Sequence, residues 1–481
     1  MIFPQIQDRQ IATCRALNLW ENGSALLWIE DAEDLAGGAV LGGGDFPLAA
    51  GGGGDWLGGM RTSWCGRVGL FVVAFAGVTA AGAAEEKPAV RQLTSGPRHH
   101  FFGYIGQSRT IPWNASGRHV LALETEFQDR LPGAGDAAGV CVIDTRDGNR
   151  VRVVDRTLGW NPQQGTMFYW NPAAPETQFF LNDRDPRTGK VFTVLFDLAR
   201  GPGGGRVREY RFDDTPVGNG GVAQAGGYFL AINYARMARL RPVTGYKDAW
   251  DWTRGVAAPA DDGIFRVDVA TGEKRLIVSF AQLKAALARL PTPPPRLAER
   301  DLFINHTLNN RDGTLVYFYC RADFEGDRDK RLNVPFTVRP DGTGLTAHDI
   351  FIGGHPEWAE GSRIVGSVED QQVVYDTEKR AIIERWGGTE TFPNPGGDIA
   401  LAPDGRWFVN SHREGEHNHY TFLERATGRV WRAPPVFMGQ WRSGDLRLDP
   451  APCWNRAGDA IVVPGIAADG TRQMFVIGVG R

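Results

Sequence analysis

The sequence predicts an all-β protein assembled from repeats, and three observations carry this prediction. A motif of a polar loop, a tight turn and a half-buried strand occurs seven times, for example in "GGHPEWAEGSRIVGS" and "GDIALAPDGRWFVNS". The copies recur about every 45 to 57 residues, with one gap of 86 between Gly227 and Gly313. The 62 glycines, 15 tryptophans and 26 phenylalanines suit short strands joined by tight turns around large flat core residues. Together these features predict a seven-bladed β-propeller of four-stranded antiparallel blades over residues 96–481.

The order of strands within one blade can be followed in residues 397–435. An inner strand leads to a turn at Asp404 and Gly405, which is followed by a second strand, a loop, a third strand and the turn "ATGR" into a fourth. The last copy, "RQMFVIGVGR", ends after a third strand. We therefore expect the early segment "AVRQLTSG" to supply the missing fourth strand and close the ring, which leaves few exposed strand edges.

Two insertions lengthen the regular repeat. Residues 241–263 form a long loop, and such loops in compact folds are usually functional or disordered. Its Trp and Tyr residues favour function, because disordered linkers are poor in aromatic side chains. Residues 279–301 contain a short amphipathic helix that ends at a run of prolines.

The N-terminal region has the build of an export signal. Within residues 60–84, Arg61 and Arg67 flank the start of an apolar run from Val68 to Val78, and small residues suitable for cleavage follow. A transmembrane anchor is the alternative, but the run is shorter than the roughly 20 residues that a membrane span needs. Because a signal peptide opens a chain, we interpret residues 1–59 as a disordered upstream extension that is not native. We expect a periplasmic or secreted protein, with no membrane association after signal cleavage.

Charge and cysteine content exclude some classes of protein. The net charge of −3, without a basic stripe, argues against a nucleic-acid partner bound through its phosphates. Cys141, Cys320 and Cys453 remain after the leader and show no CxxC spacing, so we expect no disulfide framework. We interpret all three as small buried hydrophobic side chains. For Cys453, which lies next to the repeat position that holds His306 and His355, contact with a metal is the alternative. Propellers are commonly self-contained, so we expect a monomer.

The repeat places polar side chains at one end of the central channel. The innermost strands of a propeller line this channel, so residues at one repeat position form a ring around its axis. His306, His355 and Asp398 hold this position in three successive blades. In the other copies that can be aligned, the position falls on Thr110, Met167 and Ala451. Two histidines and a carboxylate can bind a divalent metal or supply acid and base groups, or each can simply cap its strand in a wet channel.

A second group of histidines follows the inner strand of one late repeat. His412, His417 and His419 have a spacing that suits metal binding. The expected strand pattern puts them in a hairpin loop, so we interpret them as part of a surface loop.

The succession of motifs resembles a known family. "PWNASGRHVLALETEF", "GWNPQQGTMFYW", "NHTLNNRDGTLVYF", "GGHPEW" and "DPAPCWNRAGD" follow one another as in the seven-bladed propeller polysaccharide lyases, most similarly in the ulvan-lyase-like and oligogalacturonate-lyase-like branch. The resemblance covers residues 96–481. It implies β-elimination on a uronic acid, with an acidic polysaccharide or oligosaccharide as the partner. Such a carbon–oxygen lyase needs a cation for the carboxylate, a base, and an acid for the leaving oxygen.

The resemblance also implies roles for particular residues, with histidine and tyrosine transferring protons and arginine or a divalent ion binding the carboxylate. The counterparts of the catalytic groups are His306, His355, Tyr246, Arg236 and Arg241. The counterparts of the substrate-binding groups are Gln164, Asn182, Arg239, His100 and Tyr104. The counterparts of metal ligands are His306, His355 and Asp398.

The chain also departs from this branch at two positions. Asp398 and Ala451 stand where the branch has histidines, so a metal site built from all of those histidines would be incomplete. Either arginine neutralises the substrate carboxylate, or the protein is a non-catalytic propeller that binds glycan or protein at its axial face, like the translocation-associated propellers.

Overall fold

The computed structural model describes residues 89–479 except for 104–109 and 202. The expected extension at 1–59, the expected signal peptide at 60–84 and Tyr104 lie outside the described residues. In the described part, no helix is long and apolar enough to cross a membrane.

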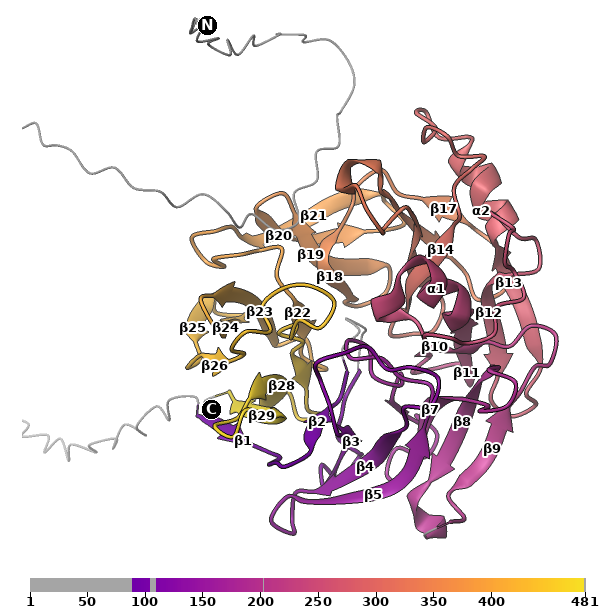
Figure 1. Cartoon of the computed structure of the whole chain (residues 1–481). Coiled ribbons are helices and arrows are strands. Elements are labelled where there is room, and N and C mark those ends of the chain that lie inside the picture. Colours follow the sequence, from indigo (N-terminus) through magenta and orange to yellow (C-terminus); the bar gives the residue numbers. More distant parts are fainter. Residues whose placement is uncertain (1–88, 104–109, 202, 480–481) are drawn as a thin grey trace, which may run out of the picture. The chain divides into compact units, whose positions relative to one another are not determined.

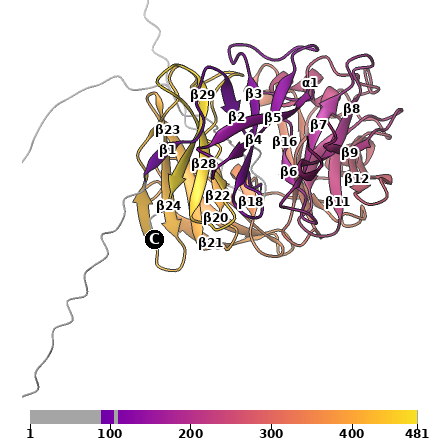
Figure 2. The ribbon, with the colours of Figure 1, turned by 90° about the horizontal axis from the view of Figure 1, so that it is seen from below.

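Seven antiparallel sheets follow one another around a central axis and form a seven-bladed β-propeller, as predicted (Figure 1). Figure 2 shows the same ring edge-on. Blade 1 contains β2 (His99–Phe101), β3 (His119–Thr125), β4 (Ala138–Asp144) and β5 (Arg150–Thr157). Blade 2 contains β6 (Tyr169–Trp170), β7 (Gln178–Arg184), β8 (Val191–Asp197), the 3-10 turn η1 (Leu198–Arg200) and β9 (Arg206–Tyr210). Blade 3 contains β10 (Gly218–Val222), β11 (Tyr228–Ile232), β12 (Gly263–Asp268) and β13 (Lys274–Ser279).

The later blades repeat this order of strands. Blade 4 contains β14 (Phe303–Asn309), β15 (Val316–Ala322), η3 (Arg328–Lys330), β16 (Leu332–Val338) and β17 (Thr346–Ala347). Blade 5 contains β18 (Gly353–Trp358), β19 (Arg363–Val368), β20 (Gln371–Asp376) and β21 (Ala381–Gly387). Blade 6 contains β22 (Ile399–Leu401), β23 (Trp407–Glu414), β24 (His417–Glu424) and β25 (Arg429–Arg432), with β26 (Val436–Phe437) added beside β24. Blade 7 contains β27 (Cys453–Trp454), β28 (Ala460–Ile466) and β29 (Arg472–Gly478).

The fourth strand of blade 7 comes from the other end of the described chain. β1 (Val90–Gln92) pairs antiparallel with β29, with Val90 opposite Ile477 and Gln92 opposite Phe475 (Figure 1). This pairing confirms the expected closure of the ring, and it begins before residue 96, where the propeller was expected to start.

Tryptophans tie neighbouring blades together. Trp170, Trp358 and Trp454 are each almost fully buried at the start of a blade. Their indole N–H groups donate to main-chain oxygens of the blade before, on Pro112 at 2.8 Å, Leu308 at 2.8 Å and Ala400 at 3.1 Å. A buried indole combines a large apolar surface with a donor that needs a partner, so each ring both fills the space between two blades and fixes their spacing.

Between β11 and the aromatic insertion at 241–263, the structure has a helix that the sequence analysis did not predict. α1 (Tyr234–Leu240) is capped by the side chain of Asn233, which accepts a hydrogen bond from the Arg236 amide. After η2 (Pro242–Thr244), the chain returns so that Tyr246 stacks on Tyr234 with 4.4 Å between ring centroids. Gly245 is needed at this return, because a Cβ atom there would lie 2.1 Å from the Ala238 nitrogen.

The second insertion contains the expected helix. α2 (Phe280–Leu287) begins with a capping box between Ser279 and Gln282 and buries Phe280, Leu283 and Leu287.

The three described cysteines are buried, which agrees with their interpretation as hydrophobic side chains. Burial raises the pKa of each thiol, so these side chains are neutral at physiological pH.

Asp262 is a buried carboxyl group near the end of the aromatic insertion. Its oxygens accept hydrogen bonds from Asn233 Nδ2 at 3.0 Å and from the Gly263 amide at 2.7 Å. Burial nevertheless raises the pKa of Asp262 to about 7. A carboxyl group whose pKa is raised by folding holds its proton more tightly in the folded state, so its contribution to stability falls as the pH rises from 3.8 through about 7.

We therefore expect the unfolding free energy of the wild type to fall relative to that of Asp262→Asn as the pH is raised from about 5 to about 8. Chemical denaturation at a series of pH values measures the difference. Asp261→Asn, at the exposed neighbouring residue, is the matched control and should follow the wild type. A difference between wild type and Asp262→Asn that stays constant with pH would contradict the assignment.

Candidate functional site

His306 and His355 lie together at one end of the central channel. His306 belongs to the inner strand β14 of blade 4 and His355 to the inner strand β18 of blade 5. Their ring centroids are 5.4 Å apart. The structure therefore places these two residues side by side, as the repeat position predicted.

The repeat position has an unusual backbone conformation. The φ angles of Met167, His306, His355 and Ala451 are 57°, 62°, 53° and 43°. The strand register shifts at the histidines, between Asn305 and Leu308 and between Gly353 and Glu357. Left-handed backbone costs a residue other than glycine about 1–2 kcal/mol, and such strain is concentrated at functional sites. The inner strands of blades 4 and 5 thus bulge at the same point.

Asp398 connects His355 to blade 7. One of its carboxylate oxygens lies 2.5 Å from His355 Nδ1, and the other accepts a hydrogen bond from the Ala451 amide at 3.0 Å. Ala451 has no polar side chain, but its backbone N–H continues the polar contacts around the axis. We call His306, His355 and Asp398 the channel site.

In this arrangement, the three side chains of the channel site cannot all coordinate one metal ion. One oxygen of Asp398 forms a hydrogen bond with Nδ1 of His355, and the second oxygen accepts a hydrogen bond from the Ala451 amide. A metal would have to replace these contacts to use the carboxylate. The arrangement instead resembles a histidine held in one orientation by a carboxylate, which is typical of acid and base catalysis.

A half-buried cluster of opposite charges lies beside the channel site. One oxygen of Asp449 is 2.7 Å from Arg413 Nη2 and 2.8 Å from Arg447 Nε. Burial by itself would raise the pKa of Asp449, but the positive charges of Arg447, Arg413 and His355 lower it well below its usual range. Asp449 is therefore ionised and holds both guanidinium groups in place.

A hollow opens next to this charged cluster. Its lining includes Phe101, Phe102, Gln163, Arg447, Ala451 and Arg472.

Arg472 is a buried cation in the wall of this hollow. Its guanidinium lies 4.1 Å from the Phe101 ring centroid and donates to the Pro162 carbonyl at 3.0 Å, while its Nε is buried without a hydrogen-bond partner. Burial lowers the pKa of Arg472 to about 10, so it stays charged at neutral pH. The hollow thus has arginine and aromatic walls.

The loop before blade 2 contributes amides to the same end of the channel. Gln164 donates to Asn305 Oδ1 at 3.0 Å, directly beside His306. When the side-chain amide of Gln163 is oriented with its oxygen towards Arg447, this oxygen accepts a hydrogen bond from Arg447 Nη1 at 3.0 Å. The predicted substrate-binding residue Gln164 therefore does lie beside the channel site.

The predicted arginines of α1 and the start of the aromatic insertion have other partners. Arg236 is buried and donates to the carbonyls of Leu302, Val256 and Ala257 and to the Thr253 hydroxyl, with distances from 2.6 to 3.0 Å. Arg239 pairs with Asp251 at 3.0 Å and with Asp301 at 3.2 Å, and Arg241 lies over the Phe324 ring at 5.0 Å. The geometry of Arg236 and Arg239 favours a structural role, in which they hold the insertion against blade 4.

Tyr246, Asn182 and His100 are also enclosed by protein. The Tyr246 hydroxyl accepts from Asn182 Nδ2 at 2.9 Å, and burial raises the pKa of Tyr246. Asn182 is fully buried and also donates to the Asn219 carbonyl, while His100 contacts Gln473 at 3.0 Å and Glu124 at 3.3 Å. These contacts join neighbouring blades, so the geometry favours structural roles for all three residues.

Sequence reasoning missed the charged residues that line the hollow, Arg447, Asp449 and Arg472. Arg447 and Asp449 come just before Ala451, and Arg472 opens the last strand of the repeat. Arg447 and Asp449 could have been predicted as site residues from their position at the start of the repeat copy "DPAPCWNRAGD".

Fold and site together define a seven-bladed β-propeller with a polar histidine site at one end of its channel. No family model matches the chain, and no curated protein matches it. Among solved structures it is similar to an oligogalacturonate lyase in complex with manganese, with 14% identity over 82% of this chain and 95% of that chain and a TM-score of 0.48. It is also similar to TolB from Acinetobacter baumannii, with 12% identity over 78% of this chain and 88% of that chain and a TM-score of 0.34. A putative TolB from Agrobacterium tumefaciens has 14% identity over 69% of this chain and 95% of that chain, with a TM-score of 0.36. These are distant likenesses between propellers.

We expect Asp398→Ala to destabilise the protein by about 1–3 kcal/mol, because the half-buried Ala451 amide would lose its acceptor. Asp398→Asn should cost less, since its amide oxygen can still accept from Ala451 and its NH₂ can face His355. Urea denaturation of the two variants and the wild type measures the difference. Equal stability of the two variants would show that the contact does not hold blades 6 and 7 together.

Proposed function

We propose that this protein is an exported polysaccharide lyase that cleaves uronate-containing polysaccharides or oligosaccharides by β-elimination. The observation that carries the proposal is the pairing of His306 with the Asp398-bound His355 at the channel end, beside a hollow walled by arginines. This arrangement holds acid and base groups next to cations that suit an anionic sugar.

The reaction needs three groups acting on one sugar residue. A base removes the proton from the carbon next to the uronate carboxylate. The electron pair left behind forms a carbon–carbon double bond and expels the glycosidic oxygen, which takes a proton from an acid. A cation at the carboxylate stabilises the negative charge that develops as the proton leaves.

The channel site and the hollow supply candidates for each role. We assign His306 as the base. The Asp398 carboxylate orients His355 and stabilises its protonated ring, which suits the acid that protonates the leaving oxygen. Arg447, whose fork-shaped guanidinium is positioned by Asp449, is the cation for the uronate carboxylate. This assignment moves the cation from Arg236 and Arg241 to the opposite side of the channel.

A second candidate function is binding of a glycan or protein at the axial face without cleavage. Both oxygens of Asp398 are engaged within the protein, and Ala451 provides no ligand side chain. These features favour a rigid binding surface over a metal-assisted reaction.

We expect His306→Ala to lower the rate of β-elimination by about 10²–10⁴-fold, the usual effect of losing a general base. The ultraviolet absorbance of the unsaturated uronate product, followed over a screen of uronate polymers, measures this rate. His119→Ala, at a histidine on blade 1, is the matched control and should keep full activity. Full activity of His306→Ala would remove this residue from the mechanism, and a wild-type protein that binds uronate polymers but cleaves none would favour the binding function.

We expect Arg447→Lys to raise KM for the uronate substrate by about tenfold or more, because hydrogen bonds to charged groups contribute about 1.5–3 kcal/mol and a point charge cannot reproduce the planar fork. Arg442→Lys, at an exposed arginine nearby in the sequence, should leave KM unchanged. If the two variants have the same KM, the carboxylate is bound elsewhere.

A further inference from the structure

His412, His417 and His419 lie in paired strands of blade 6, which corrects their interpretation as a surface loop. His412 is directly opposite His419, and Glu414 is directly opposite His417, in the hairpin of β23 and β24. Side chains along a strand alternate between its two faces, so these four residues share one face of the sheet. The pairing therefore brings together two histidines that are separated in sequence.

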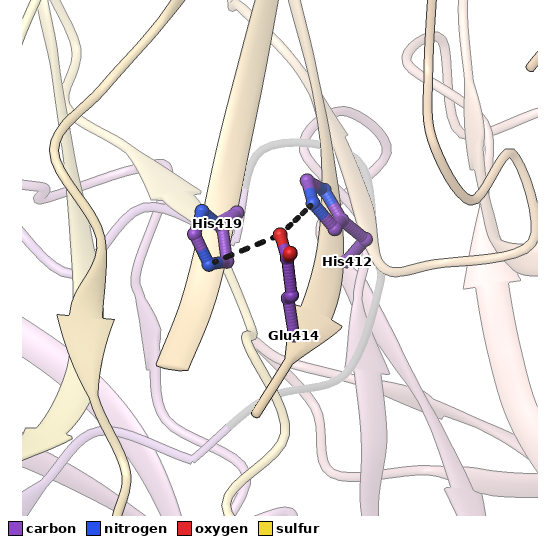
Figure 3. Close-up of side chains that lie close together, drawn as sticks. All are labelled: His412, Glu414 and His419. Atoms are coloured by element: carbon purple, nitrogen blue, oxygen red, sulfur yellow. Dashed lines mark ion pairs between the residues drawn. The ribbon is translucent and has the colours of Figure 1, made fainter. Parts of the chain in front are cut away.

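The carboxylate of Glu414 lies between two imidazole rings (Figure 3). Glu414 Oε2 is 3.9 Å from His412 Nε2 and 3.9 Å from His419 Nε2. One ligand atom from each of the three residues lies within 4.8 Å of the others. We call His412, Glu414 and His419 the rim cluster.

Burial prepares the two histidines of the rim cluster as ligands. The side chain of His412 is only 11% exposed, and its Nδ1 is buried without a hydrogen-bond partner. Burial, together with the positive charge that a neighbouring histidine would carry, lowers the pKa of both His412 and His419. Neutral imidazole is the form that binds metals.

Glu414, by contrast, is 76% exposed, so its carboxylate can move to complete a coordination shell.

We propose that the rim cluster is a binding site for a divalent transition metal ion such as Zn²⁺. Two imidazoles and one carboxylate are a ligand set that Zn²⁺ takes with a further position left to water or another ligand. Imidazole ligands favour Zn²⁺, Ni²⁺ and Cu²⁺, whereas Mg²⁺ and Ca²⁺ prefer sites made of oxygen atoms.

Binding needs only a local adjustment of the rim cluster. Zn–N bonds of about 2.0–2.1 Å place tetrahedral ligand atoms roughly 3.4 Å apart. The atoms at 3.9 Å must therefore approach by about half an ångström, and a pair at the 4.8 Å limit of the cluster by about 1.4 Å. The two rings are stacked with 4.8 Å between centroids and an angle of 19°, so they must also turn for their lone pairs to meet at one point.

The rim cluster is separate from the channel site. Arg413, between His412 and Glu414, points to the opposite face of β23, where it pairs with Asp449 beside the hollow. The proposed metal therefore does not depend on the lyase function. Its direct effect is to join β23 and β24, so bound Zn²⁺ should stabilise the folded state.

The test measures Zn²⁺ binding to the full chain, purified without a polyhistidine tag. Isothermal titration calorimetry of a His306→Ala/His355→Ala background isolates the rim cluster from the channel histidines. We expect one Zn²⁺ per chain, a rise in melting temperature on addition of Zn²⁺, and the visible absorption of tetrahedral Co²⁺ when Co²⁺ replaces Zn²⁺.

Single substitutions in this background then assign the ligands. Loss of an outer-shell partner alone costs about 10–100-fold in metal affinity, so His412→Ala, His419→Ala and Glu414→Gln should each weaken binding by at least as much. Because Glu414 is exposed, Glu414→Gln tests the site without disturbing the fold. His119→Ala, outside the cluster, should bind Zn²⁺ as the background does.

Two results would overturn the proposal. One is the absence of Zn²⁺ binding at micromolar concentrations in the background protein. The other is unchanged binding in a His412→Ala/His419→Ala variant whose circular dichroism shows that it is folded.

Discussion

The hydrogen bond from a buried indole to the preceding blade is the contact on which the ring and its channel site depend. Trp170, Trp358 and Trp454 each donate to a main-chain oxygen of the neighbouring blade, and the residue three positions before each of them has a left-handed backbone conformation. Because the indole is fixed between two blades, the residue three positions before it is fixed at the channel end. In blade 4 Asn309 takes the place of the tryptophan, and its amide donates to the Gly221 carbonyl. A packing contact between blades thus sets the position of His306 and His355.

Repetition made the fold and part of the channel site predictable. Each repeat of the sequence motif forms one blade, so residues at the same position of successive repeats lie next to one another around the axis. The repeats therefore predicted the number of blades, the closing strand β1 and the proximity of His306, His355 and Asp398. The roles of these residues in catalysis stay predictions.

The insertions and connecting loops could not be predicted in this way, because no repeat relates them to the axis. Arg236 and Tyr246 looked like site residues by type, yet α1 and the close return at Gly245 turn both inward to the protein. Arg447 and Asp449 lie in an irregular connection whose path depends on contacts with Arg413 from another strand. The histidines of the rim cluster were placed in a loop because the strand pattern gives no sign that β23 and β24 extend to Glu414 and His417.

Closure by β1 has a consequence for the order of events during synthesis. The Thr94 hydroxyl next to β1 receives a hydrogen bond from the Met474 amide, 380 residues further along the chain. A ribosome makes β1 long before β29, so the early strand must stay without its partner while the other six blades emerge. Blade 7 is therefore assembled last, and the ring can shut only when the whole propeller sequence has been released. Until then the growing chain carries two open edges, which makes the period of translation the time when it is most exposed to unwanted association with other chains.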